Sequence, residues 1–492
     1  MNTADAMRLT QKLYLRLNAR RPATQKAEEY NEGKQPLTFA TEEWKAQNAA
    51  RYSGFSDNWC APVINAEAER VSIGGITYFA SKKRAADYWD DLRRNKFELQ
   101  FSQGIIQELV SGRCFVIVWG TPDSKPIVTF EHPSMVEIQY DWENPNERVA
   151  AIKTWIDEDT EYATLYTRSE VFKWERPRQA PKDEQKSQAD QSRTPYAADG
   201  GWRPRGGDDG DWWMVNPMGV VPVVEFENRP TLRGNPISEI QGVIPMQDAV
   251  NLLWGYLFLA ADYASMDARV MLAADPPKIP ILDKDGKIVG ERPVEMKDLR
   301  EKRLISITGD NARIDSWKAA ALDIFTDTIE IAVGHIASQT RTPPHYLVAN
   351  KGLSQLSGDA LKNAEAGLVT KVREFRAFTD DSLREVLRLM ALVKGDKKAA
   401  DASALASFHW DKIEVRSEAQ LADALLKKSQ MGYPFEYLLE EAGHSPNDIK
   451  RILAMRKTEM DDALGAGIQS MVQGALNVEP EPSGVGASAE EG

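Results

Sequence analysis

Apolar residues recur at three- to four-residue steps in two stretches of the chain, separated by a polar loop. The first stretch, residues 319–341, ends before Pro343 and Pro344, because proline cannot continue a helix. The second, residues 357–409, begins with a helix that keeps its stripe up to Gly395 and is roughly 55 Å long at 1.5 Å per residue. The apolar positions of the two helices are Leu322, Phe325, Ile329 and Ile336, then Leu361, Leu368, Phe375, Leu383, Leu387 and Met390.

The first half of the chain changes its period near Cys114. Before it, helical spacing predicts helices at residues 6–30, 41–52, 57–71 with a break near Pro62, and 85–108. After it, short runs rich in β-branched and aromatic residues predict an antiparallel meander. These strands are expected at residues 115–119, 127–130, 136–140, 149–156, 161–166 and 170–174, and again at 212–215 and 220–226.

The central part predicts a helix over residues 236–269, kinked at Pro245. It is apolar on several sides, so it must be surrounded, either by copies of itself in a ring or by an ordinary core. Runs at residues 278–282 and 287–289 flank a turn and predict a β-hairpin, and a strand is expected at 304–308. The turn also begins like a calcium loop, but Ile288 stands where that loop needs glycine. The chain is therefore expected to be an α+β protein.

Composition limits the function classes. The 492 residues carry a formal net charge of −13, so broad nonspecific attraction to nucleic acid or anionic membrane is not expected. Cys60 and Cys114 lack metal-site spacing and predict two free thiols in a reducing cytosol. No secretory signal opens the chain, and the apolar run at residues 250–261 is too short to span a bilayer. A soluble intracellular protein is expected.

Residues 177–210 are rich in Pro, Gly, Gln, Asp and Arg and predict a mobile loop. The charged residues near its end indicate either a phosphate or metal site or, as the simpler interpretation, a solvated loop. They are Arg203, Arg205, Asp208, Asp209 and Asp211.

The sequence contains no Walker A loop, Gly-x-Ser-x-Gly elbow or His-Glu-x-x-His helix. The acidic pairs Asp380-Asp381 and Glu440-Glu441 lie in predicted helices with basic neighbours, which favours solvated faces over nuclease carboxylates. His335 and His345 flank the proline pair without metal-ligand spacing. We therefore expect no enzyme and no cofactor. A metal-dependent nucleic-acid enzyme and a non-viral ring or scaffold protein, membrane-associated through residues 250–261, stay open as alternatives.

Several local motifs, in this order, resemble those of the portal proteins of tailed phages, specifically the SPP1-type portals of phages of Gram-positive and actinobacterial hosts. The motifs lie at residues 30–37, 216–226, 234–238, 247–251 and 338–344, followed by Trp410 and by residues 417–432 with Lys427 and Lys428. Each motif alone is weak, but together they cover most of the chain to about Asp461.

The resemblance implies a ring, typically of twelve subunits, around a DNA channel at one capsid vertex. Carried over by position, it implies a wing (1–233), first stem helix (234–274), clip (275–318), second stem helix (319–341), tunnel loop (342–356), long wing helix (357–409) and helical crown (410–474). Residues 475–492 are expected to form a disordered tail.

The resemblance also implies roles for three residue sets. Asp323, Asp327 and Glu330 share one helix face and would line the bore, although an ordinary solvated face explains them too. The tunnel loop would meet DNA through Asn350, Lys351, Gly352, Ser354 and Gln355. The clip would dock partners through Asp283, Lys284, Asp285, Gly286 and Lys287.

The implied partners are further copies of the chain in a homododecamer, double-stranded DNA, the terminase large subunit, the major capsid and scaffold proteins, and a head-completion or adaptor protein. The ATP-driven motor must be one of these partners, since this chain has no site for ATP. The implied location is the portal vertex of the virion, and the host cytoplasm during assembly.

Overall fold

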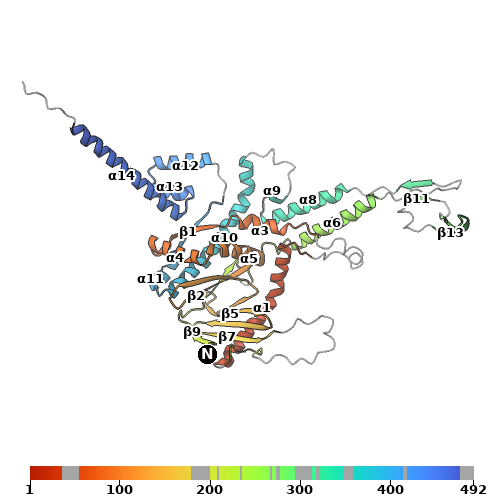
Figure 1. Cartoon of the computed structure of the whole chain (residues 1–492), viewed down its shortest axis with the longest axis horizontal. Coiled ribbons are helices and arrows are strands. Elements are labelled where there is room, and N and C mark those ends of the chain that lie inside the picture. Colours follow the sequence, from red (N-terminus) through yellow and green to blue (C-terminus); the bar gives the residue numbers. More distant parts are fainter. Residues whose placement is uncertain are drawn as a thin grey trace, which may run out of the picture. The chain divides into compact units, whose positions relative to one another are not determined.

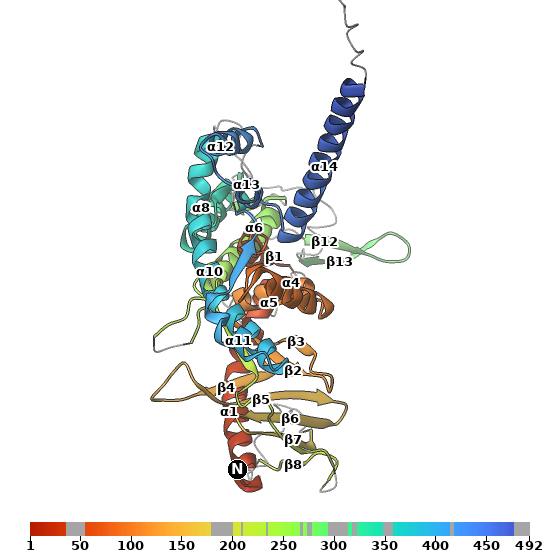
Figure 2. The same cartoon turned by 90° about the vertical axis from the view of Figure 1, so that its left-hand side faces the viewer.

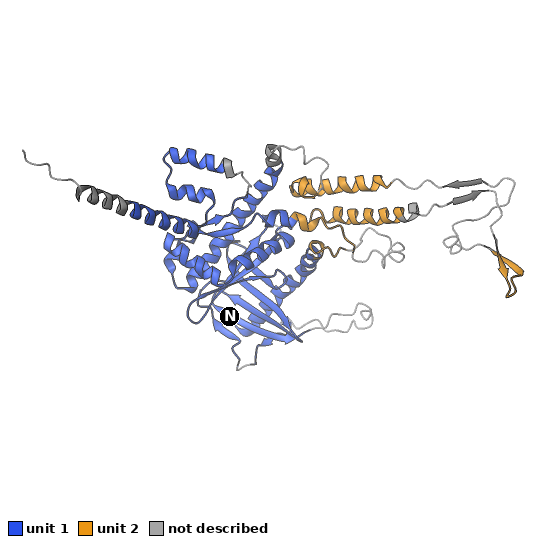
Figure 3. Cartoon of the chain, turned by 45° about the horizontal axis from the view of Figure 1, so that its top comes forward, with its two compact units in different colours: residues 1–28, 64–239, 362–492 blue, residues 29–63, 240–361 orange. Residues whose placement is uncertain are grey.

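The computed structural model describes residues 1–35, 55–178, 200–207, 210–232, 235–265, 269–272, 278–293, 313–316, 322–347, 358–413 and 418–476. The chain divides into two compact units (Figure 3). Unit 1 comprises residues 1–28, 64–239 and 362–492, and unit 2 comprises residues 29–63 and 240–361. The chain therefore crosses between the units at positions 28/29, 63/64, 239/240 and 361/362.

The larger sheet of unit 1 is a six-stranded antiparallel sheet, and all of its strands except β8 were predicted. Its strands are β4 (Val136–Tyr140), β5 (Arg148–Asp157), β6 (Thr160–Thr167), β7 (Glu170–Pro177) and β8 (Arg203–Pro204), and β9 (Trp213–Val215) also pairs with β7. Helix α1 (Thr3–Asn31) runs along this sheet (Figure 2). Its Leu13 and Leu17 pack with Leu165 and Trp174 in one buried cluster, because the apolar face of the helix meets the apolar face of the pleat.

Part of the segment expected to be a mobile loop, residues 200–207, is packed on the sheet. Residues 179–199 lie outside the described part, but β8 pairs with β7 in register Trp174 to Pro204. Trp202 is only 3% exposed and stacks 4.0 Å from the Arg176 guanidinium. The prediction is wrong for residues 200–207, because a single large aromatic ring buries enough surface to fix this segment on the sheet.

A three-stranded antiparallel sheet forms the second layer of unit 1, in the order β10 (Val223–Glu227), β2 (Arg113–Gly120) and β3 (Pro126–Glu131). Helix α5 (Phe97–Ser111) packs on β2 and β3. The predicted single helix over residues 85–108 is wrong: α4 (Lys82–Arg94) and α5 are separate. Lys96 adopts a left-handed φ of 55°, and the Asn95 amide donates to Pro126 O (3.0 Å), so tertiary contacts end the first helix.

The remaining elements of unit 1 include the predicted very long helix. This is α10 (Gly358–Val393), which spans 36 residues. Strand β1 (Ile73–Tyr78) pairs with β15 (Ser407–Trp410), a strand that the sequence did not predict. The other helices are α11 (Lys397–Asp401), η3 (Ser403–Leu405), α12 (Glu418–Gln430), α13 (Phe435–Ala442) and α14 (Pro446–Leu476).

Unit 2 contains two long helices that lie side by side, α6 (Ile244–Ser265) and α8 (Asp323–Thr340) (Figure 1). The described strands between them form two antiparallel pairs, β11 (Arg269–Leu272) with β14 (Arg313–Ser316), and β12 (Lys278–Leu282) with β13 (Ile288–Pro293). The second pair is the predicted hairpin. The short helix α9 (Pro344–Leu347) follows α8. The helix predicted at residues 41–52 and the strand at 304–308 lie outside the described residues.

Two proline predictions are wrong. Helix α6 begins at Ile244 rather than at residue 236, so Pro245 stands in the first turn, where its missing N–H is not needed and causes no kink. Helix α3 (Cys60–Ala68) likewise holds Pro62 in its first turn without a break. The mixed α and β class is as predicted, and both cysteines are buried and free.

Candidate functional site

The acidic residues of α8 form an exposed face. Asp323, Asp327 and Glu330 are all exposed, and their four- and three-residue steps place them on one side of the helix. The opposite side is buried and includes Ile329, Val333 and Ile336, which anchor α8 in unit 2. The predicted clustering of the three carboxylates on one face is therefore present, and the orientation of that face is fixed by the buried side.

Neither α6 nor α8 contains a lysine or arginine, while α8 carries three carboxylates and α6 carries Asp248 and Asp262. The three carboxylates of α8 are exposed, whereas Asp248 is buried. An exposed carboxylate face without lysine or arginine repels a polyanion instead of binding it.

The end of α8 is closed by the motif at residues 338–344. Arg341 takes a left-handed φ of 54°, and the Thr342 N–H donates to Ala337 O (3.0 Å), satisfying a terminal carbonyl. Pro343 and Pro344 follow. The proposed DNA-facing residues Asn350, Lys351, Gly352, Ser354 and Gln355 lie outside the described residues.

The hairpin turn uses its first carboxylate internally. The Asp283 carboxylate accepts from the N–H groups of Asp285 (2.8 Å) and Lys287 (3.1 Å), and Gly286 supplies a φ of +78°. Asp283 therefore shapes the turn, and its side chain is exposed together with those of Lys284, Asp285 and Lys287. The flanking aliphatic side chains of Ile281, Leu282, Ile288 and Val289 are also exposed.

Two motifs that the sequence analysis singled out meet in one polar network of unit 2. The Tyr30 hydroxyl donates to Asp248 (2.5 Å), and Asn251 donates to Gln35 (2.5 Å). Gln247 donates to Asp57 O (2.7 Å) and accepts from the Trp59 N–H (2.8 Å). The motif at residues 30–37 therefore contacts the motif at residues 247–251, which lies on α6.

Asp57 was missed by the sequence analysis. Its carboxylate accepts from the indoles of both Trp59 (2.9 Å) and Trp254 (2.7 Å). A signal for this network exists in the sequence: Gln247 and Asn251 are amides four residues apart on an otherwise apolar helix, and buried amides require polar partners.

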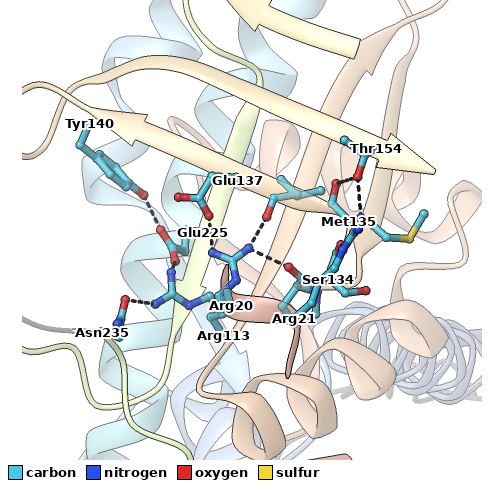
Figure 4. Close-up of polar contacts among 12 residues, drawn as sticks. Arg20, Arg21, Arg113, Ser134, Met135, Glu137, Tyr140, Thr154, Glu225 and Asn235 are labelled. Atoms are coloured by element: carbon cyan, nitrogen blue, oxygen red, sulfur yellow. Dashed lines mark hydrogen bonds and ion pairs between the residues drawn. The ribbon is translucent and has the colours of Figure 1, made fainter. Parts of the chain in front are cut away.

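Two further motifs meet at Arg113 in unit 1 (Figure 4). Its guanidinium donates to Glu225 of the 216–226 motif (2.7 Å) and to Asn235 of the 234–238 motif (2.9 Å). The Tyr140 hydroxyl donates to the other carboxylate oxygen of Glu225 (2.9 Å). The pKa of Tyr140 is raised, first by burial and then by the charge of Glu225. The two motifs are therefore joined through one buried ion pair.

Three of the four carboxylates considered for nuclease chemistry are bound to other side chains. Asp380 accepts from the Trp410 indole (2.9 Å), and Asp381 pairs with Arg384 (2.5 Å). Glu441 pairs with Lys428. Within the described ranges, no group of three or more His, Cys, Asp and Glu residues is arranged to hold a metal ion.

The two arginines near the end of the 177–210 segment contact other side chains. Arg203 lies 3.5 Å from Glu175, and Arg205 lies over the Tyr162 ring (4.8 Å). Asp208 and Asp209 lie outside the described residues. Across the part of the chain that the structure describes, every helix is too short or too polar to cross a bilayer.

The comparison with known families decides the assignment. The profile of the family described as phage portal protein, SPP1 Gp6-like, matches residues 11–462. The chain belongs to this phage portal protein family. The five ordered motifs and Trp410, which carry the resemblance, all fall inside the matched range, as the sequence predicted.

Individual portal proteins are similar over most of their length. The portal protein of Mycobacterium phage L5 is 23% identical over 440 residues, covering 85% of this chain and 82% of that protein. The portal protein of Mycobacterium phage D29 is 23% identical over 425 residues, covering 82% and 79%. A solved structure of the neck of a native GTA particle, computed with C12 symmetry, is similar at 12% identity and a TM-score of 0.43, covering 80% of this chain and 91% of that chain.

Proposed function

We propose that copies of this chain assemble into a ring around double-stranded DNA at one capsid vertex, and that DNA is packaged and ejected through its channel. In this proposal α8 turns Asp323, Asp327 and Glu330 toward the bore. The observation that carries it is the exposed three-carboxylate face on a helix pair without lysine or arginine. Membership in the portal family supports the channel role.

A channel that lets DNA slide must not hold it. Every phosphate neutralised by a fixed lysine or arginine adds affinity that depends on salt. A ring with three carboxylates per copy on its lining avoids such contacts, so the duplex experiences no deep binding minimum along its path. Lys351 and the other tunnel-loop residues, Asn350, Gly352, Ser354 and Gln355, are then proposed as weak phosphate contacts, one set per copy.

Self-assembly has support from an apolar face next to the acidic one. Ile324 and Ile331 are 64% and 63% exposed in the single chain. Large aliphatic side chains at such exposure on a regular helix favour burial by another copy. A ring of about twelve copies, as expected for the family, would cover these residues while leaving the carboxylates in the bore.

The hairpin β12–β13 is proposed as the partner-docking element. Its exposed Ile281, Leu282, Ile288 and Val289 surround a turn with Lys284, Asp285 and Lys287, a mixture of apolar and charged groups typical of a protein interface. The proposed partners are the terminase large subunit during packaging and a head-completion or adaptor protein afterwards, with capsid and scaffold proteins around the wing. The wing, stem, clip and crown boundaries given above are part of this proposal, and no enzymatic step is assigned to the chain.

The mass and symmetry of the purified protein come first. Native mass spectrometry with negative-stain images should show rings of about twelve copies. Ile331→Lys should reduce the mass of the assembly, because it places a charge in the interface between copies. A metal-dependent enzyme would instead form a monomer or dimer with a bound metal, and a membrane scaffold would need detergent.

The charge of the bore is tested by Asp327→Lys on assembled rings. Filter binding of linear duplex at several salt concentrations should show tighter retention and a steeper salt dependence, by about one unit of slope per phosphate newly contacted. Glu459→Lys, at an exposed carboxylate of α14, is the matched control and should leave retention near the wild-type value. Equal retention by both lysine variants would place the α8 face outside the bore and remove the electrostatic part of the proposal.

A further inference from the structure

Strand β1 has a partner strand on one edge only. It pairs with β15 in a separate two-stranded sheet of unit 1, and it also lies beside α4 and the start of α14 (Figure 2). Register shifts between Ile73 and Gly75 and between Ile76 and Tyr78 leave further backbone groups of β1 outside the ladder. Across the described residues, the backbone groups of residues 74–77 bond to β15 or to no other protein group. The second edge of β1 is therefore open in the single chain.

The outer edge of β3, in contrast, is closed by two side chains of the same chain. The Asn95 amide donates to Pro126 O (3.0 Å), and its oxygen accepts from the Val128 N–H (3.2 Å). The Gln100 amide oxygen accepts from the Phe130 N–H (3.0 Å). Two amide side chains thus take the place of a neighbouring strand along β3.

The other outer strands of the two larger sheets are covered or very short. On β10, Ser382 of α10 donates to Glu225 O (3.0 Å). On β4, the Arg20 guanidinium donates to Val136 O. Strands β8 and β9 contain only two and three residues. Covered edges and short strands prevent pairing with other chains, so the open edge of β1 stands apart from the rest of the described unit.

Residues 74–77 line a cleft. Its walls include Ala86 and Trp89 of α4 and Pro446 of α14, and it holds about 580 Å³ of space that is continuous with solvent. A Cβ atom on Gly75 would stand 3.2 Å from Cδ of Pro446, so the start of α14 packs directly on the backbone of the strand. The cleft therefore combines strand backbone with an apolar wall, and an extended peptide matches both.

The charges of the cleft are balanced. Lys82 of α4 pairs with Glu436 of α13 at 2.7 Å. Lys450 and Glu440 also line the cleft, so its two cations are matched by two carboxylates. A polyanion such as DNA gains no net attraction from such a site, whereas backbone pairing with a peptide needs none. The chemistry of the cleft favours a peptide segment over a nucleic acid.

We propose that, in the assembled ring, an extended segment of the neighbouring copy adds a strand to β1. This inference rests on the ring of the proposed function, which places another copy beside every β1. Each copy gives one segment and receives one, so a closed ring leaves no β1 edge open, whereas a single chain keeps one. Backbone hydrogen bonds supply the affinity, and Ala86 and Trp89 contact the side chains of the added segment.

Hydrogen exchange on the full chain tests the proposal. Wild-type rings are compared with the Ile331→Lys chain, and wild-type protein diluted below its assembly concentration serves as a second unassembled sample. Exchange at the amides of residues 74–77 should be about tenfold or more slower in the rings, because an added strand protects the amides that it binds. Residues 126–130 of β3 are the internal control. Their edge is already closed by Asn95 and Gln100, so their exchange should change by less than about threefold.

A variant with a filled cleft gives a second test. Asn447 lines the cleft and is exposed at the start of α14, so Asn447→Trp should occupy the space and abolish the slower exchange at residues 74–77 in rings. Thr458→Trp, at another exposed position of α14, is the matched control and should keep the wild-type difference.

Equal exchange at residues 74–77 in wild-type rings and in the unassembled chain overturns this proposal and leaves the ring itself intact. Fast exchange in both samples would mean that the edge stays open, and slow exchange in both would assign it to a segment of the same chain. Slowing of equal size at residues 126–130 would likewise overturn it, because general stabilisation would then explain the effect. A protein that forms no rings overturns both this inference and the proposed function.

Discussion

The phenolic hydroxyl of Tyr30 donates a 2.5 Å hydrogen bond to the carboxylate of Asp248, 218 positions later in the chain. Both residues are buried. Burial, and then the hydrogen bond to Asp248, raise the pKa of Tyr30, so the hydroxyl keeps its proton as the donor. This contact joins the end of α1 to the first turns of α6, the helix that packs with the acidic α8.

Replacing Tyr30 by phenylalanine should leave the buried Asp248 carboxylate without this donor. We expect the free energy of unfolding to fall by about 1–3 kcal/mol in urea titrations. Tyr437→Phe removes an exposed hydroxyl of α13 and should change stability by less than about 0.5 kcal/mol. Equal stabilities for the two variants would mean that the bond contributes nothing.

Trp202 anchors residues 200–207 on the larger sheet of unit 1. Its ring stacks on Arg176 and its indole donates to Gln11 (3.2 Å). Trp202→Ala should cost about 3–5 kcal/mol and release residues 200–207 to proteolysis. Trp142, 86% exposed on the β4–β5 connection, is the control, and its alanine variant should match the wild type in both measurements.

Gly104 on α5 is required by close packing. A Cβ atom there would stand 2.3 Å from Cδ1 of Phe130, inside a fully occupied core. Gly104→Ala should therefore lower the free energy of unfolding by about 1–3 kcal/mol despite alanine's better helix propensity. Gly334 on α8 meets no atom within 4 Å, so Gly334→Ala should raise stability by about 1 kcal/mol in the unassembled chain. Thermal unfolding measures both variants: a lower midpoint for Gly104→Ala and a higher one for Gly334→Ala would show that close packing, and not helix propensity, decides the effect at Gly104.

Glu227 should make stability depend on pH. Its pKa of about 7 lies above the usual 4.5, because burial and then Glu225 disfavour the charged form. A carboxyl with a raised folded-state pKa contributes most below pH 4.5, and this contribution is lost as the pH rises through 7. Denaturant midpoints at a series of pH values should fall less steeply in Glu227→Gln. The exposed Glu143→Gln should follow the wild-type curve, and a steeper fall in Glu227→Gln would contradict the assignment.

The strands of unit 1 were predictable because their side chains alternate. In β5 and β6 the apolar residues that pack with α1 stand at every second position, and the turn between the two strands contains Asp159, a common turn residue. The hairpin at Asp283 was predictable for the same reason. Side-chain alternation and turn residues are local features of the sequence, and the folded chain keeps the strands and the turn that they predict.

The start of α6 was not predictable from periodicity. The helical spacing of apolar residues in the sequence extends back to residue 236. In the structure, however, Ser238 and Glu239 both hydrogen-bond to carbonyl groups at the end of α5. These contacts between distant segments outweigh the weak preference of the segment for a helix. The split between α4 and α5 has a similar origin, since Asn95 bonds to β3.

The candidate site was predictable in part. The carboxylates of α8 could be placed on one face from spacing alone, and the motifs around Gln247 could be named. Their mutual contacts could not, because a sequence does not show which buried group meets which. Lys371 and Glu108 read as ordinary charged helix residues, and only the packing of α10 and α5 reveals them as buried.

The pairing of β1 with β15 sets an order of events during synthesis. Ile73 meets Trp410 in this antiparallel pair, so β1 has no partner strand until more than three hundred further residues have been made. At about 5–20 residues per second, β1 waits roughly 20–70 seconds on the ribosome. A chain cut short before β15 exposes an unpaired strand edge, which favours aggregation over assembly.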